Sequence, residues 1–429
     1  MKKVWNVLIF PGGTENGIEI YNSLSKCKNI RLFSVTSNVE NQAFYIYKKN
    51  HVIPEIYDRN WVVKLNDVIV ENNIDLIFPS NSLIIDALSE NKKYITCDIL
   101  LPDEKVLEVT RSKKKTIQIL KNKIPCPEVY KDKNSIFNYP VFAKPDKGYG
   151  SQNTYKINNK IELDKVNFEK YIVEEFLPGK EYTVDCFSDS NGRLLFSSAR
   201  ERSRIRMGTS MHARDVEEKL NTKLKENAEK ILDSIKISGA WFFQVKEDND
   251  GCLRLLEIDV RIAGTMCFNR CKGVNFPLLS IYQHYGLPFR IMVNEVDIEL
   301  DRCLKNRYRF NYSYDTVYID LDDTIIFNHK INTDIVKFLY QCRNNGKKIV
   351  LLSKNLENDK NGYLRKFAIF DIFDEIFWLE ESEKKSDYIH DVKSIFIDDS
   401  FSQRKEVAEK CNIPTLDSSM IECLLDDRI

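Results

Sequence analysis

Charged residues in the middle of the chain are spaced as a phosphate-binding site would require. Lys144 ends an apolar run expected to form a strand, and the glycine-bearing turn 147–151 follows it. Glycine lets backbone N–H groups approach phosphate oxygens, and the lysine supplies a fixed positive charge. Farther on, Glu174 and Glu181 flank a Pro-Gly turn between two expected strands. Taken singly, each segment also fits an ordinary turn or a charged hairpin.

A set of oxygen-bearing side chains suggests a magnesium site. Gln244 lies in one expected strand, and the sequence EIDVR, from Glu257 to Arg261, lies in the next. Side chains alternate along a strand, so Glu257, Asp259 and Arg261 should share one face. Burying three charges on one face is costly without a ligand or partner. Carboxylate and amide oxygens suit Mg²⁺ that bridges nucleotide phosphates.

Between these groups lies an alternating basic segment. Arg202, Arg204 and Arg206 precede Gly208, and His212 follows closely. Arginine binds carboxylates and phosphates through a planar fork of N–H donors, so the segment is a candidate clamp for a carboxylate or an acyl phosphate. A solvated edge strand is the alternative. His212 is a candidate contact to nucleotide or substrate, although a single loop histidine often has no such role.

In this order the segments resemble the ATP-grasp superfamily, in particular its carbamoyl-phosphate-synthase-like and amino-acid-ligase branch, over roughly residues 1–300. The resemblance implies that ATP phosphorylates a carboxylate and that an amine captures the acyl phosphate. It also implies ATP and Mg²⁺ as cofactors, with Mn²⁺ as an alternative metal. The residues that it assigns to ATP are Lys113, Lys144, Gly148, Gly150, Ser151, Glu174, Phe176 and Glu181.

The same resemblance assigns the metal to Gln244, Glu257 and Asp259, and places Arg261 beside the transferring phosphoryl group. The family usually has asparagine at the third metal position, so Asp259 adds a carboxylate and puts the number of metal ions in doubt. Strand ends of the first domain usually face substrate in this family. Thr14, Glu15 and the segment 80–82 are therefore further substrate candidates.

A second set of polar residues follows the expected strands of the last part of the chain. These strand ends carry Asp320 and Asp322, Ser353, Lys384 and Lys385, and Asp398 and Asp399. The carboxyl ends of parallel strands meet at one edge of a sheet, so these side chains can converge there. Acidic turns after strands are also common as helix caps, so Asp320 and Asp322 alone do not distinguish a catalytic site from a cap.

This second set resembles the haloacid-dehalogenase (HAD) phosphatase superfamily over about residues 315–429. The resemblance implies that Asp320 is the nucleophile, that Asp322 is the general acid and base, and that Ser353 and Lys385 hold the phosphoryl group. Lys385 is favoured over Lys384 because it directly precedes a serine. The implied Mg²⁺ ligands are Asp320, the backbone of Leu321, Asp398 and Asp399. The short gaps between these motifs leave no room for a cap domain, which predicts an open site.

The order of expected strands and helices places these sites in an α/β and α+β multidomain chain. We expect a doubly wound pre-ATP-grasp domain over 1–108, and an ATP-grasp domain with a mostly antiparallel sheet over 109–311. A small capless HAD-like Rossmannoid domain should occupy 312–429. Strands are expected over ranges that include 76–79, 95–98 and 394–397, and one helix over 110–120.

Composition restricts the partners. The chain has 64 basic and 64 acidic residues, so its formal net charge is zero, which disfavours a general nucleic-acid binder. No run approaches the roughly 18 apolar residues of a membrane span. The 11 cysteines are scattered without CxxC pairs, which favours reduced thiols in the cytoplasm. We expect small-molecule carboxylate and amine substrates, phosphorylated or not, and leave self-association open.

The combined interpretation is a bifunctional enzyme, an ATP-dependent carboxylate–amine ligase fused to a Mg²⁺-dependent phosphatase. Surface-polysaccharide or small-metabolite biosynthesis is the setting suggested by analogy. The alternative keeps the ligase and makes the last domain a sensing or interaction module. A carbamoyl-phosphate-type kinase and a biotin carboxylase are less favoured, because no second ATP-grasp unit, glutaminase or biotin-carrier segment is visible.

Overall fold

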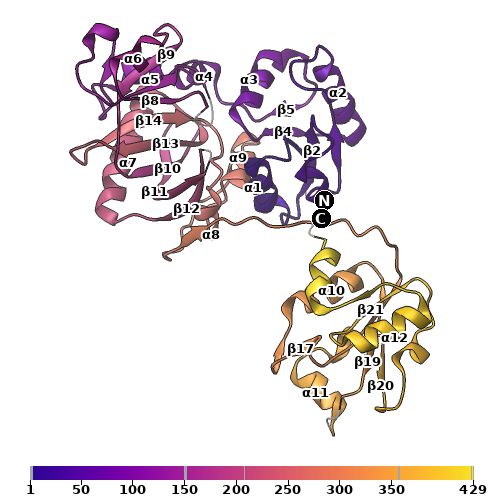
Figure 1. Cartoon of the computed structure of the whole chain (residues 1–429). Helices are drawn as coiled ribbons and strands as arrows, with labels where there is room; N and C mark the ends of the chain where they lie inside the picture. The colour runs from indigo at the N-terminus through magenta and orange to yellow at the C-terminus, as the bar shows by residue number, and fades with distance from the viewer. Residues whose placement is uncertain (1–2, 149–151, 207, 356–357, 427, 429) are drawn as a thin grey trace. The chain divides into compact units, whose positions relative to one another are not determined.

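The chain forms two compact units, Met1–Leu304 and Lys305–Arg428, each described here by itself (Figure 1). The computed structural model describes residues 3–148, 152–206, 208–355, 358–426 and 428. All 11 cysteines are free thiols. Within the described ranges, no helix combines the length and the apolar character needed to cross a membrane. The expected division of the first unit near residue 108 stays a prediction.

The first unit begins with a five-stranded parallel sheet in the order β3-β2-β1-β4-β5. Its strands are β1 Trp5–Phe10, β2 Ile30–Thr36, β3 Asn50–Val52, β4 Leu76–Pro79 and β5 Asp98–Ile99. Its helices are α1 Glu15–Leu24, α2 Trp61–Asn72 and α3 Ser82–Asn91. The strand expected over 95–98 starts later, because the Asn66 side chain bonds the backbone of Tyr94 and Thr96 and withholds it from the sheet.

A four-stranded antiparallel sheet in the order β6-β9-β7-β8 follows. Its strands are β6 Val129–Tyr130, β7 Val141–Pro145, β8 Tyr155–Ile157 and β9 Tyr171–Glu175, accompanied by α6 Lys160–Asp164. The helix expected over 110–120 is α5 Lys113–Leu120, and a separate helix, α4 Glu104–Thr110, ends where the expected one would begin. The break occurs because the Ser112 side chain accepts a hydrogen bond from the Lys115 backbone and caps α5. This cap places Lys113 in the first turn of α5.

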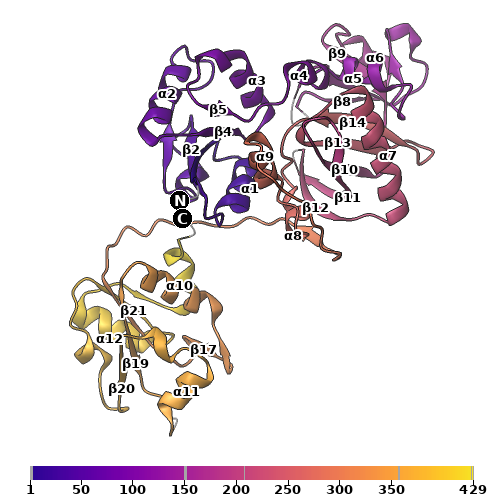
Figure 2. The ribbon, with the colours of Figure 1, turned by 180° about the vertical axis from the view of Figure 1, so that it is seen from behind.

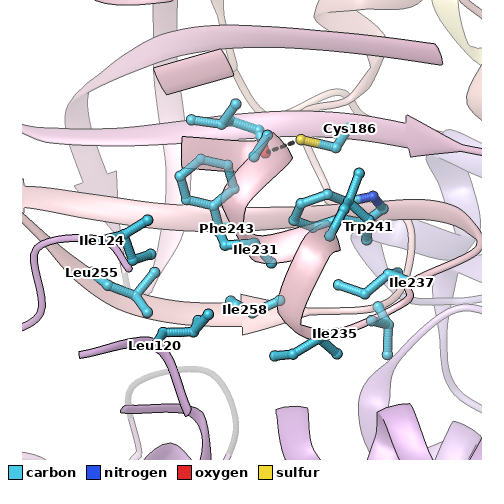
Figure 3. Close-up of a cluster of buried hydrophobic side chains, with 14 of the residues drawn as sticks. Leu120, Ile124, Cys186, Ile231, Ile235, Ile237, Trp241, Phe243, Leu255 and Ile258 are labelled. Carbon is cyan, nitrogen blue, oxygen red and sulfur yellow. Dashed lines mark hydrogen bonds between the residues drawn. The ribbon is translucent and has the colours of Figure 1, made fainter. Parts of the chain in front are cut away.

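The largest layer of the first unit is a six-stranded antiparallel sheet in the order β14-β13-β10-β11-β12-β15. Its strands are β10 Glu181–Ser188, β11 Leu194–Arg206, β12 Thr209–Asp215, β13 Gly239–Glu247, β14 Leu253–Asp259 and β15 Glu299–Asp301. Its helices are α7 Glu218–Ser234, α8 Cys267–Cys271 and α9 Phe276–His284. One face of this sheet packs apolar side chains against α7 (Figure 3), where Trp241 and Phe243 are fully buried.

The second unit is built on a five-stranded parallel sheet in the order β20-β19-β16-β21-β22. Strands β19, β20 and β21 are labelled in Figure 2. The sheet strands are β16 Thr316–Ile319, β19 Lys348–Ser353, β20 Glu375–Trp378, β21 Ser394–Ile397 and β22 Thr415–Leu416. A hairpin, β17 Ile326–Phe327 and β18 Lys330–Ile331, and the helices α10 Thr333–Asn344, α11 Lys360–Lys366 and α12 Phe401–Cys411 complete the main elements. Because β16, β19 and β21 are parallel neighbours, their carboxyl ends share one edge.

Short 3₁₀ helices connect the main elements of both units. They are η1 Gln42–Tyr45, η2 Lys92–Tyr94, η3 Lys133–Ser135, η4 Phe370–Ile372, η5 Lys385–Tyr388 and η6 Ser418–Leu424. The fifth of these begins at Lys385, at the sheet edge where β16 and β21 end.

We predict that Phe243→Ala lowers the free energy of unfolding of the first unit by about 3–5 kcal/mol, since it removes a buried ring and leaves a cavity. Phe137→Ala is the matched control, because Phe137 is 84% exposed. Urea unfolding of the full chain, with the transition of the first unit followed by hydrogen exchange in β13, measures the difference. A loss below about 1 kcal/mol for Phe243→Ala would contradict the packing described.

Candidate functional site

The first unit contains a cavity of about 410 Å³ that lies over the polar face of the six-stranded sheet. The residues expected from the sequence that line it are Lys113, Lys144, Gly148, Glu174, Phe176, Glu181, Gln244, Glu257 and Arg261. Thr14, Glu15 and Asn81 line it as well. Gly150 and Ser151 lie outside the residues that the structure describes. The structure thus gathers side chains from well-separated segments around one space.

Strand register explains how the sheet presents its polar residues. Gln244 of β13 stands opposite Glu257 of β14, and on its other side opposite Thr183 of β10. Directly opposed residues of antiparallel strands point to the same face. An amide oxygen and a carboxylate are therefore neighbours on the cavity side, and this pair fits the oxygen ligands that Mg²⁺ prefers.

Lys144 is held by a buried ion pair. Its Nζ lies 2.6 Å from Oε1 of Glu174 and donates to the Leu256 carbonyl at 3.1 Å. Both side chains are almost fully buried. Burial raises the pKa of Glu174 above its ordinary value, although Lys144 opposes the shift. Glu174, which the resemblance assigns to ATP, therefore has a partner that the sequence did not predict.

Lys113 approaches the cavity from the first turn of α5. Its Nζ lies 3.3 Å from the carbonyl oxygen of Gly148, at the start of the glycine-bearing turn. Burial lowers the pKa of Lys113 below its usual range, and the nearby Glu257 opposes this effect. Lys113 and Lys144 bring two cationic side chains to the same cavity.

Phe176 directly follows β9 and Glu181 begins β10; these strands belong to different sheets, and both side chains line the cavity. Glu181 forms an ion pair with Arg202, and Lys246 stands 4.0 Å from its other oxygen. The Lys156 ammonium lies over the Phe176 ring, 4.3 Å from its centroid. Arg202 thus serves as the partner of Glu181 in this structure, which differs from its expected place in the clamp.

Asp259, the third expected metal ligand, lies among cationic side chains. Its carboxylate is ion-paired with Arg111 at 2.8 Å and with Arg261 at 2.7 Å, and it accepts a hydrogen bond from the Ser82 hydroxyl at 2.8 Å. Burial would raise the pKa of Asp259, but the two arginines hold it below its ordinary value. Both oxygens of Asp259 thus have cationic partners in this structure, and its assignment to the metal stays a prediction. The ion pair with Asp259 also holds the Arg261 guanidinium in place.

Of the expected clamp, Arg202 lines the cavity, whereas Arg204, Arg206 and the nearby His212 lie outside its lining. The register between β11 and β12 shifts around Arg204, and Ile205 lines the cavity in its place. A bulge of this kind inverts the alternation of side chains beyond it. Arg204 instead pairs with Asp301 at 2.7 Å, and His212 lies 3.0 Å from Glu299.

In the second unit, one lysine bridges two of the expected aspartates. The Nζ of Lys385 lies 2.6 Å from Asp320 and 2.6 Å from Asp398. Lys385 is buried whereas Lys384 is exposed, so the structure brings Lys385 to the cluster. Oxygens of Asp320, Asp398 and Asp399 lie within 4.8 Å of one another, and such a set of carboxylates could hold Mg²⁺.

Asp322 has a partner that the sequence did not reveal. The side-chain amide of Asn355 donates to both oxygens of Asp322, each at 2.9 Å, while the Asn355 backbone donates to the Ser353 hydroxyl at 3.1 Å. Burial raises the pKa of Asp322 above its ordinary value, against the hydrogen bond from Asn355. In the sequence, the one indication of this contact was the position of Asn355, an amide side chain two residues after Ser353.

Comparison with known proteins supports the fold of the first unit. Residues 167–300 match the family described as ATP-grasp in the biosynthetic pathway with Ter operon. A biotin carboxylase of Campylobacter jejuni has a TM-score of 0.58 at 17% identity, covering 68% of this chain and 74% of that one. An N5-carboxyaminoimidazole ribonucleotide synthetase of Thermotoga maritima has a TM-score of 0.53 at 18% identity, covering 69% and 79%. No protein of curated function matches the sequence.

These likenesses give the first unit an ATP-grasp fold. A carboxylase domain of Hydrogenobacter thermophilus, solved with ADP, magnesium and bicarbonate, adds a TM-score of 0.56 at 16% identity, over 70% of this chain and 73% of that one. At such identities the likeness concerns the fold alone. The family match ends at residue 300, before the second unit begins.

The carboxyl cluster of the second unit predicts a pH-dependent stability. Burial, together with the nearby Asp398, raises the pKa of Asp320 to about 7, against the effect of Lys385. In an unfolded chain the value is about 3.9. A carboxyl whose pKa is raised by folding stabilises the folded state when protonated. This contribution is full below about pH 4 and is lost as the pH rises through about 7.

Without divalent metal, Asp320→Asn should therefore stabilise the second unit at pH 8, by about 1 kcal/mol or more, and have little effect at pH 4. Thermal unfolding of the full chain at both pH values measures this. Asp371→Asn, which changes an exposed aspartate of the same unit, is the control. A variant that is less stable than wild type at pH 8 would show that the Asp320 carboxylate is not under electrostatic stress.

Proposed function

We propose that the first unit is an ADP-forming ligase that joins a carboxylate to an amine. The observation that carries this proposal is the pair Gln244 and Glu257, side by side over a cavity that Lys113 and Lys144 also line. Two oxygen ligands and two cations in one cavity provide what binding of a metal–triphosphate complex requires. The ATP and ADP complexes among the proteins of similar fold support the same nucleotide here.

In the proposed reaction, a carboxylate oxygen attacks the γ-phosphorus of ATP and ADP departs. An amine then attacks the acyl carbon, and inorganic phosphate leaves. Lys113 and Lys144 offset the charge of the phosphates, and Arg261, fixed by Asp259, lies at the cavity wall where the phosphoryl group would transfer. Gln244 and Glu257 would hold Mg²⁺, which would neutralise phosphate charge.

The setting of the reaction is also proposed. The matched family is described by its place in a biosynthetic pathway, which supports a biosynthetic reaction here. A small-metabolite or surface-polysaccharide product stays a prediction by analogy. The substrates would be a small carboxylate and a small amine. A cytoplasmic location stays a prediction from the reduced cysteines.

Glu257→Gln should lower ATP-dependent ligation by about a hundredfold or more, because the change keeps the shape of the side chain and removes its charge beside the proposed metal. Carboxylate-stimulated ADP release by the purified full chain, with mass spectrometry of the products, is the measurement. Glu229→Gln, on the exposed surface of α7, is the control. Full activity of a folded Glu257→Gln variant would contradict the proposed metal site.

We propose further that the second unit is a HAD-like phosphatase. The observation that favours it is the junction at one sheet edge of Asp320, Lys385 and Asp398, with Asp322 held nearby by Asn355. This convergence supports the motif assignment made from the sequence. The alternative, in which the second unit senses phosphate or binds a partner without catalysis, uses the same residues as a binding site only.

In the proposed hydrolysis, the Asp320 carboxylate attacks phosphorus while Asp322 protonates the departing ester oxygen. Asp322 then accepts a proton from the water that cleaves the aspartyl phosphate. A raised pKa suits Asp322 to carrying that proton. Lys385 and Ser353 would hold the phosphoryl oxygens, and Asp320, Asp398, Asp399 and the backbone of Leu321 would hold Mg²⁺, which would offset the repulsion between anions.

Asp320→Asn should abolish hydrolysis of phosphate esters and leave ADP release by the first unit unchanged. The test compares p-nitrophenyl phosphate, phosphorylated amino acids, amino alcohols and sugars, and the phosphorylated ligase products as substrates of the full chain. Asp322→Asn should slow both formation and breakdown of the intermediate, and Asp371→Asn should change neither. If wild type turns over no ester and beryllium fluoride does not bind at Asp320, the non-catalytic alternative replaces this proposal.

A further inference from the structure

The cavity of the first unit has a buried ion pair in its wall that the proposed nucleotide site does not use. Arg200 and Asp185 are 2% and 0% exposed, and the guanidinium donates through Nε at 2.8 Å and through Nη2 at 3.1 Å. Asn269 donates to the same carboxylate at 2.9 Å. Asp185 is thereby fully engaged, and it fixes the orientation of Arg200.

Two donors beside this ion pair lack partners. Nη1 of Arg200 and the hydroxyl of Thr183 are buried and have no hydrogen-bond partner among the described residues. Both residues line the cavity, and they stand directly opposite each other on β11 and β10. Buried donors are nearly always satisfied in native proteins, because an unsatisfied one carries its full desolvation cost. A ligand in the cavity would supply the missing acceptor.

We propose that Arg200 and Thr183 form the subsite for the carboxylate group of the ligase's acid substrate. Two adjacent donors match the two oxygens of one carboxylate. Asp185 already neutralises the guanidinium, so the subsite offers directed hydrogen bonds with little net charge. This favours a singly charged carboxylate over a phosphate dianion. The inference rests on the proposed ligase function and deepens it by assigning the acid.

The position of the subsite on the sheet fits this role. Thr183 stands opposite Gln244, and Gln244 stands opposite Glu257, so one row crosses from Arg200 to the proposed metal ligands. Neighbouring strands are about 4.8 Å apart, which puts Thr183 one strand and Arg200 two strands from Gln244, roughly 5 and 10 Å. An acid bound there has its carboxylate beside the place where the γ-phosphate would lie.

The test is calorimetric titration of the full chain, saturated with MgADP, with acetate, succinate, L-glutamate and inorganic phosphate. Thr183→Val keeps the shape of the side chain and removes the hydroxyl. Arg200→Lys keeps the charge beside Asp185 and removes the fork. The matched controls are Thr222→Val on the α7 surface and Arg270→Lys, whose arginine pairs with Glu19 away from the cavity lining.

We expect at least one carboxylate to bind wild type, and each subsite variant to weaken it about tenfold or more, which corresponds to the loss of one hydrogen bond to a charged group. MgADP affinity and the controls should change less than about twofold. If Arg200→Lys does not fold, Thr183→Val decides alone.

The proposal is overturned if wild type with MgADP bound takes none of the three acids, or if the variants bind them as tightly as wild type. It is also overturned if phosphate, and not a carboxylate, is the anion whose binding the variants lose. Failure of wild type to bind MgADP would instead overturn the nucleotide site on which the subsite depends. The two failures are therefore distinguishable.

Discussion

Charged side chains crowd one face of the six-stranded sheet, and each can be buried only if an opposite charge or a hydrogen-bonding partner meets it. Strand register supplies those partners. Glu181 meets Arg202, and Asp185 meets Arg200, across β10 and β11. Gln244 and Glu257 remain as neighbouring residues whose side-chain oxygens face the cavity and can ligate a metal ion. The candidate site is thus the part of this face where polar side chains are not already paired with other described residues and can bind a ligand.

The second unit satisfies the same constraint with a single lysine. Lys385 compensates Asp320 and Asp398 at once, yet the carboxylates still outnumber it, and burial keeps the pKa of Asp320 near 7. A cation would relieve that imbalance. The same group of carboxylates therefore destabilises the folded protein when no cation is bound and would bind a metal ion in the proposed reaction.

Local patterns in the sequence were enough to predict strands such as β4 and β21. Only the family resemblance joined Lys144, Gln244 and Glu257 in one site, and the structure places all three around one cavity. Alternation failed at Arg204, where a bulge that no residue type announces inverts the faces. Alternation along a strand also could not reveal ion pairs between residues that are far apart in the sequence. Arg111, which forms an ion pair with Asp259, is 148 residues away along the chain. The roles of the site residues stay predictions.

The most direct test of an acyl-phosphate intermediate in the first unit follows the carboxylate oxygen of the acid. An acid that stimulates ADP release would be labelled with ¹⁸O in its carboxylate and incubated with ATP and an amine. The enzyme would be the Asp320→Asn chain, in which the proposed phosphatase is silent. We expect the inorganic phosphate released to carry one ¹⁸O atom from the acid. Unlabelled phosphate, with its new oxygen taken from water, would contradict an acyl phosphate and leave the first unit an ATPase.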